Sequence, residues 1–166
     1  MSNLETDNLD TMSKRFWARV EKDSEKLALR EKDFGIWNEY TWRDYGDRAR
    51  LVGHGLKALG LERGDVCSIA SEVNKEWLFA DLGVIGMGGV TNGVYPTDAP
   101  NQVEYLVTDS GTKFYFAEDE EQLDKILEVR ANTPTLQKII IFDMEGLRNF
   151  SDTQCISFEE LLEIGQ

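Results

Sequence analysis

The feature that most constrains the fold is a regular alternation of short apolar runs and helical patterns along most of the chain. Buried-type runs begin near Val66, Val90, Lys113 and Lys138, and one amphipathic helical pattern separates each run from the next. Strands that are separated by single helices are typical of a parallel sheet with right-handed crossovers. The sequence therefore predicts an α/β fold whose mostly parallel sheet carries helices on both faces.

Start and stop signals define the helices between these strands. Asn74 can cap the helix after the first strand, and Asp98 is predicted to cap the next helix, with Pro100 in its first turn. Gly111 is predicted to end that helix. A further helix is expected over residues 119–130, because apolar residues recur there at helical spacing.

A different pattern precedes the alternation. Two β-rich runs, 27–30 and 36–42, flank a charged turn with Gly35 and predict a β-hairpin. A short helix is expected over residues 9–22. Residues 1–8 are polar and are expected to be disordered, so that 9–166 form one α/β domain.

Two capping boxes mark helix starts, one from Thr41 to Asp44 and one from Ser157 to Glu160. The second capping box begins a helix, and the sequence ends within that helix. We expect such an ending when a chain is cut within a longer protein. His54, the only histidine, lies off the apolar stripe of the first of these helices. It is interpreted as a solvated residue; the alternative, a catalytic base, has no partner residues.

Composition excludes several classes of partner. The chain has 31 acidic and 18 basic residues and a formal net charge of -13, which would repel nucleic acids and anionic lipid headgroups. No apolar run approaches the ~20 residues of a membrane-spanning helix. The two cysteines, Cys67 and Cys155, lack metal-ligand spacing and no secretory segment precedes them, so reduced thiols in a cytoplasmic protein are expected.

Parallel sheets bind ligands at the carboxyl ends of their strands, but no loop there has a recognisable phosphate-binding pattern. The first such loop is Ser71–Asn74 instead of G-x-G-x-x-G. The glycines over 83–89 lie within and after a helix, which indicates close helix packing and a helix stop. Ser110–Lys113 resembles a phosphate loop but follows a helix and opens a strand, so it is interpreted as a helix terminator.

The acidic run Glu118–Glu121 leaves two interpretations open, a hard-cation site or a solvated helix cap. The cap is favoured because consecutive side chains point in different directions. No catalytic, cofactor-binding or metal-binding residue is therefore assigned in this chain.

The run Gly93–Tyr105 resembles a characteristic stretch of the long-chain acyl-CoA synthetases, within the adenylate-forming superfamily. Further segments resemble that family in the same order, from Phe16 almost to the end: Leu27–Arg30, Tyr40–Trp42, Leu59–Val66, Asn74–Trp77, Lys138–Asp143 and Ser157–Leu162. The fold that this resemblance implies agrees with the α/β order of elements. It also implies that this chain is a partial subdomain of the larger adenylate-forming fold.

The resemblance implies an enzyme that uses ATP and Mg²⁺ to form an acyl-adenylate and then transfers the acyl group to coenzyme A. The family's Ser-Gly-Thr-Thr-Gly-x-Pro-Lys-Gly loop, its metal-binding glutamate and its C-terminal lysine have no counterpart here. The expectation is therefore an N-terminal part of a fatty acid–CoA ligase, truncated before the nucleotide loop and inactive alone. Tyr95–Thr97 matches a family motif, either as a turn into a helix or as a substrate contact.

The partners implied are the remainder of the same polypeptide and, in the intact enzyme, the fatty acid. A homodimer and a peripheral membrane location of the intact enzyme stay open. The alternative function is a standalone α/β interaction or ligand-binding module of the same ancestry, with no chemistry of its own.

Overall fold

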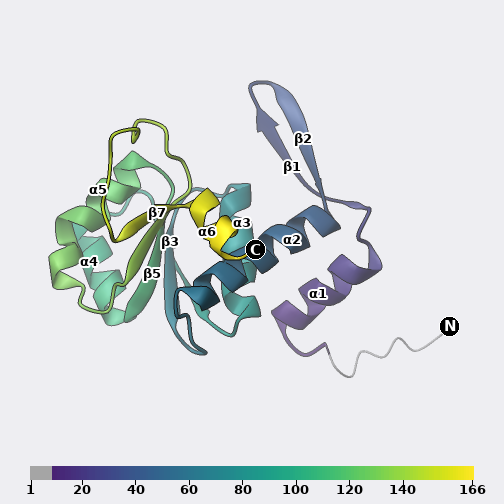
Figure 1. The fold of residues 1–166 in the computed structure, drawn as a ribbon, viewed down its shortest axis with the longest axis horizontal. Helices are drawn as coiled ribbons and strands as arrows, with labels where there is room; N and C mark the ends of the chain where they lie inside the picture. The colour runs from purple at the N-terminus through teal and green to yellow at the C-terminus, as the bar shows by residue number, and fades with distance from the viewer. Residues whose placement is uncertain (1–8) are drawn as a thin grey trace.

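The computed structural model describes residues 9–166 (Figure 1), so the expected disorder of residues 1–8 lies outside the described range. The chain opens with helix α1, the antiparallel hairpin β1–β2 and helix α2, as the sequence predicts. Helix α1 begins three residues after the expected start, because the hydroxyl of Thr11 caps it by accepting from the Lys14 N–H at 3.2 Å. The bounds are α1 Met12–Lys22, β1 Leu27–Asp33, β2 Ile36–Thr41 and α2 Trp42–Ala58.

The rest of the chain alternates strands and helices around one five-stranded sheet. Its strand order is β4-β3-β5-β6-β7, and every neighbouring pair is parallel. The strands are β3 Val66–Ala70, β4 Val90–Val94, β5 Thr112–Ala117, β6 Lys138–Ile141 and β7 Cys155–Ser157. The helices are α3 Lys75–Gly86, α4 Pro100–Asp109, α5 Glu120–Val129, the short 3-10 helix Arg130–Asn132 and α6 Phe158–Ile164.

This arrangement confirms the predicted fold class, a parallel α/β sheet preceded by a helix and a hairpin. Helices α2, α3 and α6 lie on one side of the sheet and α4 and α5 on the other (Figure 1). The fifth strand, β7, was not predicted. It has only three residues, all partly exposed, and no apolar run marks it in the sequence.

The sheet side chains alternate between the two helical layers, as the period of two of a β-strand requires. Those that face α2, α3 and α6 are Cys67, Ile69, Phe114, Phe116 and Ile140. Those that face α4 and α5 are Ala70, Tyr115, Ala117, Ile139 and Ile141. Because both sets are buried, the strands appear in the sequence as continuous apolar runs and not as alternating ones.

One helix position differs from the sequence prediction. Asp98 does not cap α4; the N-cap is Ala99, and Pro100 is the first helical residue. The Asp98 carboxylate instead accepts from the Tyr95 N–H at 3.2 Å, and the Asp98 N–H donates to the Tyr95 carbonyl at 2.9 Å. The prediction of an Asp98 cap was therefore wrong because this side chain closes the turn before the helix.

The glycines of α3 allow it to pack closely on α2. A Cβ atom added at Gly83 would lie 2.8 Å from the Ala49 carbonyl oxygen and 2.8 Å from the Val52 Cβ. A Cβ atom at Gly86 would meet only the Trp17 indole nitrogen, at 3.6 Å. The predicted role of this glycine cluster in close helix packing is thus confirmed at Gly83, and Gly88 ends the helix region with a φ of 83°.

We expect Gly83→Ala to destabilise the fold by about 1–3 kcal/mol, because the new methyl group overlaps backbone and side-chain atoms of α2. Gly86→Ala is the matched control in the same helix. It should be neutral or stabilising by up to about 1 kcal/mol, because alanine favours helix and the site has space. Urea unfolding of both variants measures the difference, and a Gly83→Ala protein at least as stable as Gly86→Ala would contradict the packing argument.

Candidate functional site

The carboxyl edge of the parallel sheet is the first place to search for a site. The loop after β3 leads to α3 on one side of the sheet, whereas the loop after β5 leads to α5 on the other side. Neighbouring strands whose connections leave in opposite directions open a crevice between them. In open α/β sheets this switch point between β3 and β5 is the usual ligand position.

The carboxylate of Glu118 occupies this switch point. It accepts a hydrogen bond from the Glu72 N–H at 2.7 Å and one from the Asn74 side-chain amide at 3.3 Å. The backbone of Glu118 joins the neighbouring strands, since its N–H donates to Ala70 at 3.0 Å and its carbonyl accepts from Asp143 at 2.8 Å. The crevice is therefore closed by a side chain of the protein, and its negative charge opposes a phosphate there.

The loop between β3 and α3 satisfies its own polar groups. The Asn74 side-chain oxygen accepts from the Trp77 N–H at 2.8 Å and caps α3, as predicted. Its amide also donates to the Ser71 hydroxyl at 2.9 Å, and that hydroxyl donates to the Glu72 carbonyl at 2.7 Å. The cap therefore occupies the Trp77 N–H, one of the backbone donors that a bound anion could use at the start of the helix.

Several acidic side chains of this edge accept hydrogen bonds from backbone N–H groups. Asp119 accepts from the Gln122 N–H at 3.0 Å and caps α5, and Asp143 accepts from the Glu145 N–H at 2.8 Å. Glu121 forms an ion pair with Lys125 at 2.9 Å. Over residues 9–166, no group of three or more His, Cys, Asp or Glu side chains could hold a metal ion. The cap interpretation of the acidic run is thus confirmed at Asp119.

A hollow of about 390 Å³ lies beside the switch point, at the ends of β3 and β4. It is lined by Ser71–Val73, Trp77 and Gly93–Thr97. The segment Tyr95–Thr97 forms a turn before α4, and the Lys125 ammonium holds the turn by donating to the Pro96 carbonyl at 2.5 Å. The structure therefore supports the turn interpretation of this motif.

The remaining polar candidates lie away from this edge. The Ser110 hydroxyl donates to the Leu106 carbonyl at 2.6 Å at the end of α4, and the Lys113 ammonium donates to the Asp65 carboxylate and to the Gly60 carbonyl, both at 2.7 Å. The segment Ser110–Lys113 therefore ends α4, as predicted, and lies at the amino edge of the sheet, opposite the carboxyl edge. His54 is exposed on α2, which confirms its solvated position.

Neither thiol is activated. Burial, with a smaller contribution from the Asp65 carboxylate, raises the pKa of the Cys67 thiol to about 12. Burial and the Asp152 carboxylate raise the pKa of Cys155 to about 11. Because the thiolate is the reactive form, the raised pKa of each cysteine lowers its reactivity as a nucleophile near neutral pH.

Comparison with known proteins identifies the family of this chain. A family model described as AMP-binding enzyme matches residues 16–160. The chain belongs to this family of AMP-binding enzymes. At the carboxyl edge of its sheet, the Glu118 carboxylate bridges the loop after β3 and the end of β5.

Long-chain-fatty-acid–CoA ligases are among the similar curated proteins. The chain is 28% identical to the ligase ACSBG1 of Rattus norvegicus over 156 residues, which are 94% of this chain and 21% of that protein. It is 30% identical to ACSBG2 of Xenopus laevis over 135 residues, or 81% of this chain and 18% of that protein. The chain thus spans about a fifth of the length of these relatives.

Two solved structures share the fold. The anthranilate CoA ligase AuaEII in complex with anthranoyl-AMP has a TM-score of 0.78 and 23% identity, over 91% of this chain and 26% of that chain. The A-PCP didomain of the carboxylic acid reductase from Segniliparus rugosus, in complex with AMP, has a TM-score of 0.79 and 13% identity. That match covers 92% of this chain and 26% of the didomain.

Removal of the Glu118 carboxylate should destabilise the switch point. We expect Glu118→Ala to cost about 0.5–1.5 kcal/mol, because the exposed Glu72 N–H loses its acceptor and the Asn74 amide keeps only the Ser71 hydroxyl. Glu118→Gln keeps an acceptor oxygen and should cost less. Urea unfolding and hydrogen exchange at the Glu72 amide measure the effect.

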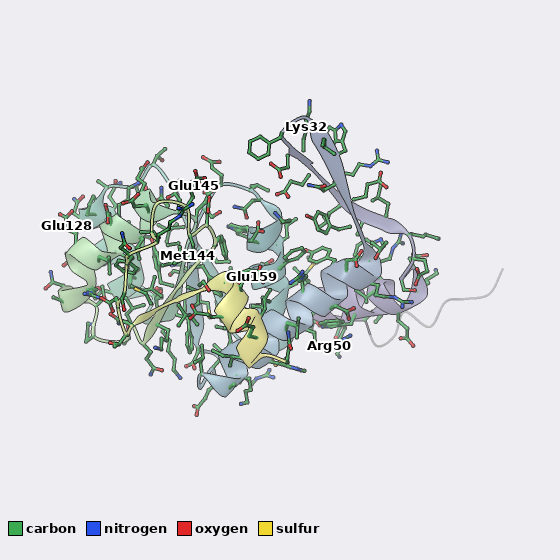
Figure 2. All side chains as sticks on the ribbon, turned by 45° about the horizontal axis from the view of Figure 1, so that its top comes forward. Lys32, Arg50, Glu128, Met144, Glu145 and Glu159 are labelled. Carbon is green, nitrogen blue, oxygen red and sulfur yellow. The ribbon has the colours of Figure 1, made fainter. Side chains whose placement is uncertain are left out.

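Glu128→Ala is the charge control, because it removes the same charge from an exposed position on α5 (Figure 2). It should leave both readouts unchanged. Equal effects of Glu118→Ala and Glu128→Ala would show that charge, and not the hydrogen bonds at the switch point, sets the stability.

The raised pKa of Cys155 predicts slow alkylation. At pH 8 the thiolate fraction of a group with a pKa of about 11 is roughly 100-fold below that of an ordinary cysteine. Iodoacetamide should therefore label Cys155 in the folded chain roughly 100-fold more slowly than in urea, as followed by peptide mass spectrometry. Similar rates in both conditions would contradict the raised pKa.

Proposed function

We propose that residues 9–166 form the N-terminal α/β subdomain of an AMP-forming long-chain fatty acid–CoA ligase, truncated before the nucleotide loop and inactive alone. The observation that carries this proposal is the family match over 16–160 together with relatives that are fatty acid ligases and about five times as long. In this proposal ATP, Mg²⁺, coenzyme A and the fatty acid act in the intact enzyme.

The carboxyl edge supports the proposed inactivity, because its residues do not fit a nucleotide. Phosphoryl chemistry needs converging backbone N–H groups, a lysine and a metal ion to neutralise charge. The switch point holds the Glu118 carboxylate instead, and the nearby Lys125 ammonium is bound to Glu121 and to the Pro96 carbonyl. No step of the reaction is assigned to residues of this chain.

The role that we propose for the segment is mechanical. Its sheet is packed on both faces, which supplies a rigid layer to which the catalytic part of the ligase can be attached. Among residues 9–166 no helix is long and apolar enough to cross a membrane. A cytoplasmic location with peripheral membrane contact, and a homodimer of the intact enzyme, are parts of the same proposal.

An ATP–pyrophosphate exchange assay with a long-chain fatty acid tests this function. The 166-residue chain and the longest polypeptide that its gene encodes are compared, with reactions lacking fatty acid as controls and circular dichroism as a check of folding. We expect exchange that depends on fatty acid only from the longer polypeptide. Exchange by the 166-residue chain would overturn the proposed inactivity, and its absence from both would favour a non-catalytic module.

A further inference from the structure

The charge of this protein is unevenly distributed among its helices. Helices α1 and α2 carry eight lysine or arginine residues and three acidic residues, whereas α3, α4, α5 and α6 together carry two and eleven. All eight cationic residues of α1 and α2 are exposed. The net charge of -13 predicts repulsion of anionic lipids by the chain as a whole, but it does not describe the surface that α1 and α2 form.

The cations of α1 are grouped on one side of the helix. Met12, Arg15, Arg19 and Lys22 follow one another at spacings of three and four residues, which places them in one stripe along α1. All four are exposed, Met12 by 72%. Glu21, the acidic residue of α1, lies outside the stripe, because residues one or two positions apart do not share a helix side. We name these four residues the basic stripe.

The other side of α1 packs on α2 and fixes the direction of the stripe. Phe16 is buried in this contact. The guanidinium group of Arg19 lies 5.4 Å from the ring centroid of Trp42, and that of Arg50 lies 5.4 Å from the ring centroid of Trp17 (Figure 2). Tryptophan and arginine both combine an apolar body with a polar end, which suits them to the headgroup region of a bilayer.

The acidic groups near the end of the stripe are already paired. Asp23 is 5% exposed and forms ion pairs with Arg19 at 2.8 Å and with Lys26 at 2.6 Å. Glu25 is paired with Arg43 of α2. Because two cations share the single carboxylate of Asp23, positive charge remains at this end of α1.

The acidic helices α4 and α5 lie at the other end of the molecule. Figure 1 shows α1 toward one end of the longest axis and α4 and α5 at the opposite end, beyond the sheet. The layer of α2 and the sheet lie between them, each about 10 Å thick. At physiological ionic strength charges are screened beyond about 8 Å. A surface that approaches α1 therefore meets the field of the basic stripe and little of the acidic helices.

We propose that the basic stripe docks this protein on a bilayer that contains anionic phospholipids, with Met12 inserted among the headgroups. This inference rests on the proposed function, because a long-chain fatty acid partitions into bilayers and a ligase that acts on it gains from contact with them. Charge complementarity supports an anionic partner. The exposed methionine within the stripe favours a lipid surface over a nucleic acid, which would leave that side chain without an apolar contact.

Co-sedimentation with vesicles tests the docking surface. The 166-residue chain is mixed with vesicles of phosphatidylcholine alone or of phosphatidylcholine with phosphatidylserine. We expect binding only where phosphatidylserine is present, and weaker binding as salt is added. Arg15→Glu combined with Lys22→Glu should weaken binding by roughly tenfold or more, because two attractive charges become repulsive. Met12→Gln should cause a smaller loss at every salt concentration.

Lys32→Glu combined with Arg148→Glu is the matched control. It makes the same change of net charge at two exposed positions outside the stripe, on the hairpin and in the loop between β6 and β7. This control should change binding by less than about twofold, because both positions lie away from the docked helix. Circular dichroism of every variant checks that the fold is kept.

Four outcomes would overturn the inference. They are equal binding to vesicles without phosphatidylserine, equal losses in the two double variants, stripe-dependent self-association, which indicates a second copy, and stripe-dependent binding of polyuridine RNA that is tighter than binding to vesicles. Vesicle binding and pyrophosphate exchange by the longest polypeptide that the gene encodes separate the two proposals. Exchange without stripe-dependent binding overturns the docking surface, and stripe-dependent binding without exchange overturns the proposed function.

Discussion

The two-sided burial of strand β5 is the constraint on which the structure depends. Phe114 and Phe116 pack toward α2, α3 and α6, whereas Tyr115 and Ala117 pack toward α4 and α5, and all four are fully buried. Because β5 pairs with β3 on one side and β6 on the other, it joins both helical layers and the centre of the sheet. A polar substitution at any of these four positions would place a polar group within an apolar layer.

The same strand determines the chemistry of the carboxyl edge. Glu118 follows β5 directly, and the opposite exits of the loops after β3 and β5 place its carboxylate in the crevice between them. The hydrogen bonds that it accepts tie Glu72 and Asn74 to the end of β5. The position that holds a ligand in many open α/β sheets therefore serves here to join loops, which agrees with a supporting role.

Local signals in the sequence predicted much of this fold, and contacts between distant residues account for what it did not predict. Asn74 and Ser157 cap helices through residues three positions away; Asn74 was predicted from its residue type before a helical pattern, and Ser157 from the spacing of a capping box. The role of Glu118 depends on partners 44 and 46 positions away, for which no local pattern exists. Asp98 had the residue type of a cap, but the turn that it closes decided its position.

The hairpin shows a further limit of sequence patterns. The residue types of β1 and β2 predicted two strands, and the pattern was the same for residues that pack and residues that do not. Tyr40 packs against Phe79, whereas Ile36 and Trp37 of the same strand are exposed. A high strand propensity indicates residue types that fit a half-buried sheet surface, while the burial of each residue depends on what lies beside it. Aromatic and branched residues are therefore exposed on the outer half of a ribbon whose base packs on α3.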